Sequence, residues 1–346
     1  ERGGILIGSI VGVNYGIIKG CYNGNNINVL LSDDTYIGFI KCGGIVGGNN
    51  GLIEGCYNKG KLNISLQSDE VIGYGGITGE NYSTGTINKC YNIGAIHGSG
   101  PTGGIAGFNF GYVYNCYNTG EINGGHGGGS GIADNNGGII QNCYNVGVTY
   151  GSGIADSNHG TIENCYYLDI SKDGVKYNYG KCNTMRCAYE SMKMKNTFSG
   201  FDFNETWTIG GNTGYYFPYL FGTNVDYEKN ILYIAVTGLP EKTEYLEAKD
   251  HFDDKGLQIT IYYSDGTTEQ KSITQEMVSG FDNTKVGPQT LTVTYGGKTA
   301  TFNVCIIAKK SEKIEISKLP TKNSYYEYDD KFEADGGKIL IYYNNE

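Results

Sequence analysis

Six cysteines recur in one short word, and their type and spacing are the first feature that could do chemistry. The word reads CYN five times and CYY once, as in NCYNTGEI at 115–122. Clustered thiols bind metals or form disulfides, whereas a thiol repeated at one place in a structural unit acts as a small apolar side chain. The repeated cysteines are Cys21, Cys56, Cys90, Cys116, Cys143 and Cys165.

The separations between these cysteines point to a repeat architecture. They run 35, 34, 26, 27 and 22 residues, and periods of 20–50 residues are typical of solenoids and arrays. Each unit has a small-residue word such as GGIAG (103–107), an Asn-x-Gly turn, and then G-x-[IV]-x-x-CYN. These pieces are too short and too rich in glycine for helices, which favours short strands. We expect one coil of a parallel β-solenoid per unit, with about three strands, and predict that the insertion 25–41 bulges as a loop.

Equivalent residues of a solenoid stack about 4.7–4.9 Å apart, so each repeated residue type should form a ladder. The six cysteines should form an internal structural ladder, together with the Ile three residues before each. A corner or a bulge must lie between the two, because Lys89 is one of the intervening residues. Inter-coil disulfides and a metal site are the alternatives, although parallel Cβ vectors suit disulfides poorly and no CxxC spacing occurs. The Asn after each Tyr should form a hydrogen-bonded corner ladder: Asn23, Asn58, Asn92, Asn118 and Asn145. Cys182 and Cys187 lie outside the ladder, and their redox state stays open.

The tyrosine of each word should face outward, because side chains alternate along a strand. Stacked phenol rings would offer a surface for sugar rings or a host protein, although such a ladder also stabilises a sheet or lies under loops. This predicted ligand-binding ladder comprises Tyr22, Tyr57, Tyr91, Tyr117, Tyr144 and Tyr166.

Two aspartates replace the last glycine of the small-residue word in adjacent coils. Asp134 and Asp156 are 22 residues apart, so they should stack as neighbours, with His159 close behind. Paired carboxylates could serve acid–base cleavage of a polysaccharide or, like Asp33-Asp34, bind calcium, but neither spacing matches an EF-hand loop. The alternative is that both aspartates cap turns. We expect no cofactor, with calcium as the metal to consider.

The rhythm of the repeat breaks after residue 167. AYESMKMKNT (188–197) is the one stretch with helical character, and the aromatic segment around Trp207 should cap the solenoid or form a ligand platform.

From residue 225 apolar and polar residues alternate regularly along the predicted strands, with hairpin signals at Asp265-Gly266 and Gly296-Gly297, as in a β-sandwich. Leu239-Pro240 and Tyr245 recur 80 residues later. The predicted segments are 1–167 solenoid, 168–224 cap with one short helix, 225–310 Ig-like β-sandwich and 311–346 a second, truncated repeat.

The composition of the chain limits the classes of partner that it is expected to bind. The net charge is -10 without clustered Lys or Arg, which argues against nucleic acid. No run of 18 apolar residues occurs, so no membrane-spanning segment is expected. Both ends lie inside a pattern, which indicates a piece of a longer chain. We expect a monomeric module.

The repeat words resemble a known family. GGIAG-FNFGYVYNCYNTGEI is similar to the GLUG repeat of bacterial surface proteins, which also occurs in streptococcal immunoglobulin A-specific metallopeptidases. CYYLD…AYESMK…FSGFDF…TW…YYFPYL resembles the segment that closes such arrays, and GLPEKTEYLEAKDHFDDKGLQITIYYSDGT resembles the bacterial Ig-like domain (group 3). The resemblance implies a secreted or wall-attached protein of a Gram-positive-type bacterium, often an adhesin.

The peptidase activity does not carry over to this chain. That chemistry needs a zinc-binding HExxH, and none of His97, His126, His159 and His251 has such a neighbour. We therefore expect a non-catalytic extracellular module, a stalk with an adhesion face for a host protein or glycan. The alternatives are a polysaccharide-binding or polysaccharide-cleaving β-helix, or the accessory region of a surface peptidase.

Overall fold

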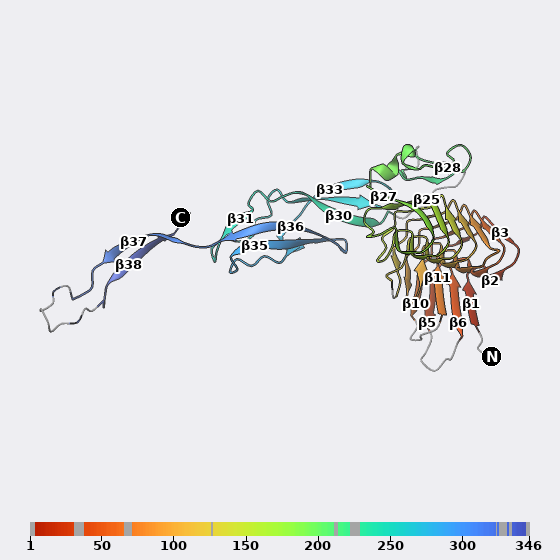
Figure 1. The fold of residues 1–346 in the computed structure, drawn as a ribbon. Helices are drawn as coiled ribbons and strands as arrows, with labels where there is room; N and C mark the ends of the chain where they lie inside the picture. The colour runs from red at the N-terminus through yellow and green to blue at the C-terminus, as the bar shows by residue number, and fades with distance from the viewer. Residues whose placement is uncertain are drawn as a thin grey trace. The chain divides into compact units, whose positions relative to one another are not determined.

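The computed structural model describes residues 4–30, 38–65, 71–125, 127–210, 214–221, 229–322, 324, 331 and 334–343 (Figure 1). They form two compact units, 1–232 with 262–268, and 233–261 with 269–346. The protein is all-β, as predicted. Helical structure in the described residues is limited to three 3-10 turns, η1 (Ser191–Lys193), η2 (Lys195–Thr197) and η3 (Gln275–Met277). Across those same ranges, no helix has the length and apolar character needed to cross a membrane.

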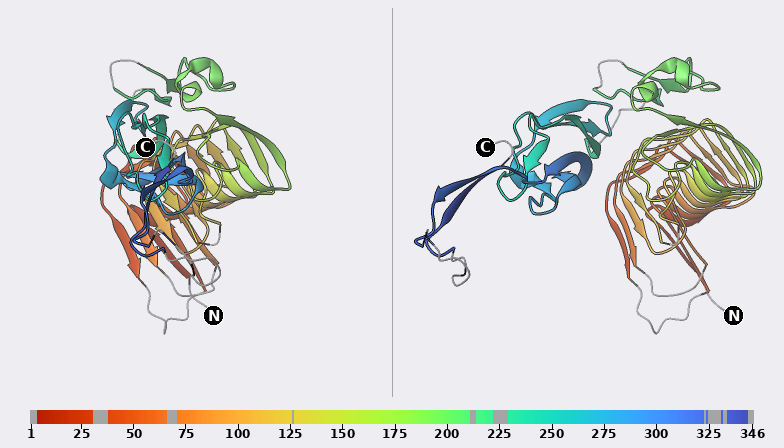
Figure 2. Two further views of the ribbon diagram at one scale, coloured as in Figure 1. Left: turned by 90° about the vertical axis from the view of Figure 1, so that its left-hand side faces the viewer. Right: turned by 60° about the vertical axis from the view of Figure 1, so that its left-hand side comes forward.

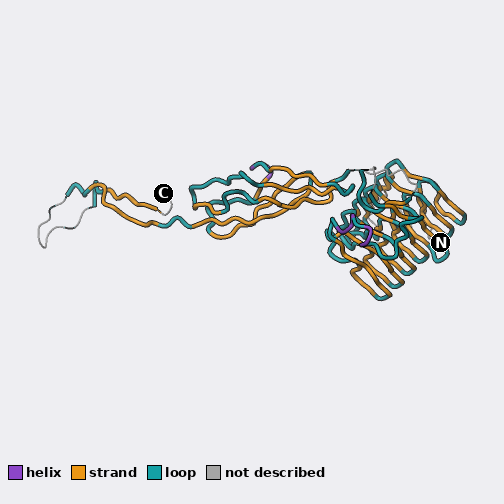
Figure 3. Tube along the Cα trace, turned by 90° about the horizontal axis from the view of Figure 1, so that it is seen from above, coloured by secondary structure: helices purple, strands orange, loops and turns teal. Residues whose placement is uncertain are grey.

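The first unit is a parallel β-solenoid. Figure 3 shows its strands, in orange, side by side in successive coils. We name its four sheets A to D. Sheet A holds β1 (Gly4–Gly8), β6 (Phe39–Gly43), β11 (Val71–Gly75) and β16 (Thr102–Gly103). Sheet B holds β2 (Val11–Asn14), β7 (Val46–Asn49), β12 (Thr78–Asn81), β17 (Ala106–Asn109), β21 (Ala133–Asn136), β24 (Ala155–Asn158) and β26 (Val175–Asn178).

Sheets C and D complete each coil. Sheet C holds β3 (Ile17–Lys19), β8 (Leu52–Glu54), β13 (Thr86–Asn88), β18 (Tyr112–Tyr114), β22 (Ile139–Gln141), β25 (Thr161–Leu168), β23 (Tyr144–Asn145), β19 (Tyr117–Asn118), β14 (Tyr91–Asn92), β9 (Tyr57–Asn58) and β4 (Tyr22–Asn23), with β27 (Lys181–Cys187) paired to β25. Sheet D holds β5 (Ile27–Leu30), β10 (Leu62–Ser65), β15 (Ile96–Gly98) and β20 (Ile122–Asn123).

The longer coils contain five strands, so the expected three strands per coil are wrong for them. The predicted insertion 25–41 is partly strand, because β5 and the start of β6 pair in register with β10 and β11; residues 31–37 lie outside the described part. Such pairing satisfies backbone groups that a loop would leave to water. Figures 1 and 2 show these red-to-orange strands extending beyond the other coils.

The interior divides into two cores. One runs the length of the solenoid and is built from repeated Ile, Cys and Ala, including Ile87 and Cys90. The other lies between sheets A and D, where Ile40 and Tyr74 meet Leu62 and Ile96. The extra residues of the long coils therefore make a second hydrophobic layer.

Two ladders of buried asparagines hold the coils in register. In the corner ladder, Asn58 Nδ2 donates to Asn92 Oδ1 at 2.8 Å, and Asn92 Nδ2 donates to Asn118 Oδ1 at 2.7 Å. Each amide also donates to the carbonyl two residues on. A second Asn ladder, which the sequence analysis took only as turns, runs along the end of sheet B through Asn14, Asn49, Asn81, Asn109, Asn136, Asn158 and Asn178.

The aromatic segment packs on the side of the solenoid rather than on its end. Trp207 lies 5.8 Å from the Tyr144 ring, and Phe198 lies 4.9 Å from the Tyr166 ring. This cap contains a two-stranded sheet of β28 (Trp207–Thr208) and β29 (Tyr219–Leu220). The predicted helix is two separate 3-10 turns, because Met194 between them has extended backbone angles.

The second unit contains two sheets of Ig-like type. One holds β30 (Ile231–Gly238), β32 (Gln258–Tyr263) and β33 (Thr268–Ser272). The other holds β31 (Glu244–Leu246), β36 (Lys298–Ile307), β35 (Gly287–Tyr295) and β34 (Val278–Ser279). The predicted hairpin at Gly296-Gly297 is present, and both glycines have positive φ angles of 55° and 75°, which a tight two-residue turn requires.

In the part of the chain predicted to begin a second Ig-like repeat, the described residues contain one antiparallel pair of strands. It consists of β37 (Ser311–Lys318) and β38 (Lys338–Tyr343) in antiparallel pairing. Residues 325–330, where Tyr245 recurs as Tyr325, lie outside the described residues.

We predict that Asn92→Ala lowers the free energy of unfolding by about 2–4 kcal/mol. The change leaves the buried amide of Asn58 without its acceptor and the buried oxygen of Asn118 without its donor, and each such loss costs about 1–3 kcal/mol. Urea denaturation measures the difference. Asn183→Ala, on an exposed position of β27, is the matched control and should change stability by less than about 0.5 kcal/mol. Equal effects of the two changes would contradict the role of the ladder.

Candidate functional sites on the solenoid

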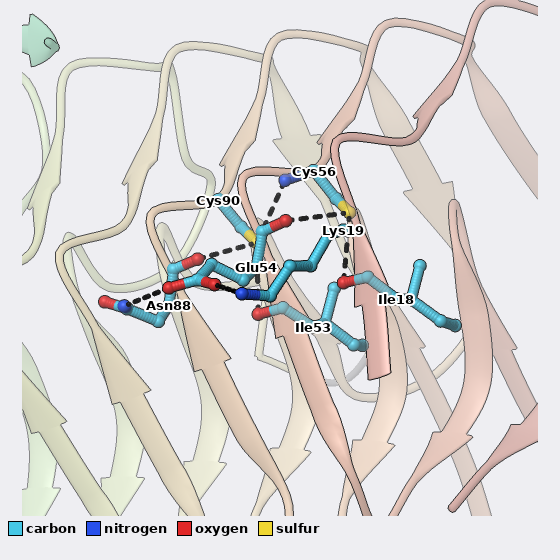
Figure 4. Close-up of polar contacts among 7 residues, drawn as sticks. All are labelled: Ile18, Lys19, Ile53, Glu54, Cys56, Asn88 and Cys90. Atoms are coloured by element: carbon cyan, nitrogen blue, oxygen red, sulfur yellow. Dashed lines mark hydrogen bonds and ion pairs between the residues drawn. The ribbon is translucent and has the colours of Figure 1, made fainter. Parts of the chain in front are cut away.

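The Cys ladder lies inside the solenoid and is hydrogen-bonded to the backbone. Cys56, Cys90 and Cys116 are fully buried. The backbone N–H of Cys56 donates to Cys90 Sγ at 3.4 Å, and Cys56 Sγ donates to the Glu54 carbonyl at 3.4 Å (Figure 4). The same two bonds recur at Cys116, whose N–H donates to Cys143 Sγ at 3.4 Å and whose Sγ donates to the Tyr114 carbonyl at 3.0 Å. Each of these thiols is therefore a packing element whose polar atom has partners.

The residue before each repeated Cys has left-handed backbone angles and turns the chain. This turn explains how both the Ile and the Cys of one repeat point inward. Lys89, directly before Cys90, has φ of 52°, and Asn115, Asn142 and Asn164 have φ of 50–53°. Asn tolerates this conformation better than most residues, and glycine adopts it freely, as Gly55 does at 62°. The corner that the sequence required near Lys89 is thus present.

The alternatives for the cysteines receive no support from the structure. All ten cysteines are free thiols, including Cys182 and Cys187. Within the ranges that the structure describes, no group of three or more His, Cys, Asp or Glu is placed to hold a metal ion. On the outer side of the same sheet, Lys19 Nζ lies 2.6 Å from Glu54 and holds the pKa of that carboxyl below its usual value (Figure 4).

The Tyr ladder stacks as expected, but most of it is closed to a ligand. Ring centroids lie 4.8–5.2 Å apart from Tyr22 through Tyr144. Tyr91, Tyr117, Tyr144 and Tyr166 are nevertheless at most 3% exposed. Aromatic residues of the cap cover the later rungs, with Trp207 against Tyr117 and Tyr144, and burial raises the pKa of both phenols. Only Tyr22, 59% exposed, and the half-buried Tyr57 remain of the predicted surface.

Asp134 and Asp156 are brought together as neighbours on sheet B. The register aligns Gly107, Asp134, Asp156 and Lys176 in one column. In the coils before Asp134, a side chain in this column would clash with sheet A, because a Cβ on Gly107 would lie 2.5 Å from the Tyr74 backbone nitrogen. Sheet A ends at β16, and the two carboxylates stand where its next strands would lie.

Both carboxylates of this pair are half-buried, and their closeness affects their electrostatics. Burial, followed by the neighbouring Asp156 carboxylate, raises the pKa of Asp134 to about 7, while a hydrogen bond from the Thr102 backbone acts in the opposite direction. Lys176 Nζ lies 3.8 Å from Asp156 Oδ1. His159 stacks on Tyr179, with centroids 4.8 Å apart. Asp33, Asp34 and His126 lie outside the described residues.

A polar column that the sequence analysis did not single out lies on the outer face of sheet D. Asn28, Asn63, His97 and Asn123 occupy equivalent register positions, and Tyr150 follows through the bridge between Ile122 and Thr149. A groove of about 380 Å³ runs along this column. The alternation of INVL (27–30) and LNIS (62–65) is the signal for these strands in the sequence, although the variable length of the segment favours a loop.

Comparison with known proteins identifies the second unit. Residues 239–305 match the bacterial Ig-like domain (group 3) family. The chain therefore combines a parallel β-solenoid with a bacterial Ig-like domain. The likeness of the solenoid to GLUG repeats stays a prediction.

Two curated relatives carry the names of enzymes. Pectate lyase L of Thermoclostridium stercorarium is 32% identical over 117 residues, which cover 34% of this chain and 9% of that protein. An exo-beta-1,6-galactobiohydrolase of Bifidobacterium longum subsp. longum is 39% identical over 74 residues, or 20% of this chain and 5% of that protein. The chain thus spans less than a tenth of either relative. A solution structure of a protein provisionally described as a surface protein is 38% identical, with 25% of this chain and 97% of that chain covered and a TM-score of 0.16.

We predict that the Cys ladder resists thiol reagents in the folded protein. The ladder thiols from Cys56 to Cys165 are at most 1% exposed, so a reagent in solution cannot reach them while the protein is folded. Iodoacetamide should first modify the half-buried thiols, which are Cys182, Cys305 and Cys21 at the start of the ladder. The buried ladder thiols, from Cys56 to Cys165, should react only in denaturant. Peptide mass mapping measures the order, and modification of Cys116 as fast as Cys182 would contradict the buried ladder.

We predict that Asp134→Asn makes stability less dependent on pH. The folded-state pKa of about 7 lies above that of an unfolded Asp, about 3.9, so the folded protein holds this proton more tightly. The free energy of unfolding of the unmodified protein should fall relative to the variant as pH rises from about 4 to about 7, by about 2–4 kcal/mol in total. Asn keeps an acceptor for the Thr102 backbone. Urea denaturation at several pH values tests this, with Asp169→Asn as the exposed control, and a constant difference across pH would contradict the assignment.

Proposed function

We propose that this chain is a non-catalytic extracellular module of a larger bacterial surface protein. The solenoid serves as a rigid scaffold that presents a ligand-binding face, and the Ig-like domains serve as spacers. One observation carries this proposal: the repeated thiols and amides, which could do chemistry, are buried and bonded to each other or to the backbone. The side chains that define the repeat are thus used for cohesion between coils.

The comparisons support an auxiliary role. The match to the bacterial Ig-like domain (group 3) at 239–305 supports a spacer role for the part of the chain that follows the solenoid and the cap. The two curated relatives are much longer than the segments they share with this chain, which supports a module that accompanies other domains. An extracellular location agrees with an acidic chain of net charge -10.

A polysaccharide-cleaving solenoid is the second candidate, because both relatives are named as carbohydrate-cleaving enzymes. Its acid–base pair would be Asp134 and Asp156. Their setting argues for structure instead, since Asp134 is half-buried and accepts a hydrogen bond from the Thr102 backbone at the end of sheet A. A general acid must reach a glycosidic oxygen in solvent-accessible space.

The whole chain, incubated with polygalacturonate and with β-1,6-galactan, should release no product above the buffer control. Reducing-end and unsaturated-sugar assays measure both hydrolysis and elimination. The double variant Asp134→Asn, Asp156→Asn should give the same background. Product formation that this variant abolishes, in a folded protein, would overturn the non-catalytic proposal.

A further inference from the structure

We propose that the outer face of sheet D is a binding site for an uncharged polysaccharide that lies along the solenoid axis. The site is the outer column Asn28, Asn63, His97, Asn123 and Tyr150, with the groove beside it. This inference deepens the proposed function, because it names the ligand class and the face that binds it.

The column repeats hydrogen-bonding groups at a constant step. Adjacent strands of a sheet are about 4.7–4.9 Å apart, so the four polar rungs and Tyr150 form a straight line parallel to the axis. Amides and a neutral imidazole each offer both a donor and an acceptor, as sugar hydroxyls do. A polymer of similar rings can therefore repeat one contact at successive coils, which a folded protein surface cannot.

The column is rigid because a hydrophobic layer supports it from behind. Leu62, Ile96 and Ile122 alternate with the outer residues and are fully buried in the core between sheets A and D. Asn63 Nδ2 donates to Asn28 Oδ1 at 2.8 Å, which fixes the orientation of these two amides. A preorganised face loses less conformational entropy when a ligand binds.

The face is open and offers an aromatic platform. Asn28 and Asn123 are exposed, and Leu30 at the rim of the groove is 80% exposed. Tyr150 is 60% exposed, and its hydroxyl lies 3.5 Å from Glu121 Oε1. A tyrosine ring held at its polar end presents its face to an apolar sugar face.

The charge pattern favours an uncharged polymer. His97 Nε2 lies 3.7 Å from Glu121 Oε1, and burial followed by the charge of Lys61 lowers the pKa of His97, so the imidazole is neutral near pH 7. One lysine and one glutamate beside the column offset each other. An anionic polymer would need several cations, and a cationic one several carboxylates.

The other faces of the solenoid fit such a ligand less well. Glycines of sheet B lie directly against the backbone of sheet A. Sheet C carries ion pairs on its outer side, between Lys19 and Glu54 and between Lys181 and Glu163. The cap covers most of the Tyr ladder.

Affinity electrophoresis of the whole chain through gels that contain soluble β-glucan, galactan or xylan tests the site, with polygalacturonate as the anionic comparison. We expect at least one neutral glycan to retard the protein. Tyr150→Ala should weaken the binding roughly tenfold or more, and Asn63→Ala should weaken it to a smaller extent. Tyr179→Ala and Asn183→Ala, at exposed positions outside the column, are the matched controls and should bind like the unmodified protein. Thermal melts confirm that each variant is folded.

Three outcomes would overturn the assignment. They are no retardation by any neutral glycan, binding to polygalacturonate alone, and binding that survives both column variants but is lost with Tyr22→Ala. The last result would place the site on the exposed start of the Tyr ladder. None of them would restore a catalytic role, which the product assays decide separately.

Discussion

Axial contact between equivalent side chains is the constraint on which this solenoid depends. Parallel pairing in register places each residue about 4.7–4.9 Å from its counterpart in the next coil, so a residue type must pack favourably against its own copy. Asparagine does so because its amide donates to one neighbour and accepts from the other, as Asn92 does between Asn58 and Asn118. Cysteine does so because its thiol is small and bonds to the backbone. Charged residues do so poorly, because like charges repel at this spacing. The pKa of Asp134 is raised mainly by burial and further by the neighbouring Asp156 carboxylate.

The same constraint explains how coils of different length share one core. Additional residues leave the common path and form sheets A and D, which pair among themselves. Sheet A then lies against the column of sheet B that contains Gly79 and Gly107, where a side chain would not fit. Where sheet A ends, aspartate replaces glycine in that column. The sequence change from GGIAG to SGIAD thus follows the disappearance of a neighbouring strand.

The repeat, the strand-rich coils and the register of the Cys word could be predicted because they depend on spacing alone. The second Asn ladder was missed because Asn-x-Gly is also the signature of a turn, and a turn and a ladder use the same residue here. Sheets A and D were missed because INVL, LNIS and IHG share little beyond their alternation. The burial of Tyr117 and Tyr144 could not be predicted from the sequence pattern. Alternation indicates which face of a strand a side chain occupies, but not which segment covers that face.

The contrast between inner and outer columns bears on where this protein can meet a ligand. Each inner column consists of nearly one residue type, because every member must pack against the equivalent residue of the next coil. The composition of these columns therefore reflects contact between coils. The outer column of sheet D faces solvent, and within it Asn63 bonds to Asn28. It holds three asparagines, a histidine and a tyrosine instead of lysine–glutamate pairs like those on sheet C. Uncharged hydrogen-bonding groups can exchange their bonds to water for equivalent bonds to the hydroxyls of a sugar. Their alignment on a rigid, open face is better explained by a ligand with the same uncharged polar character.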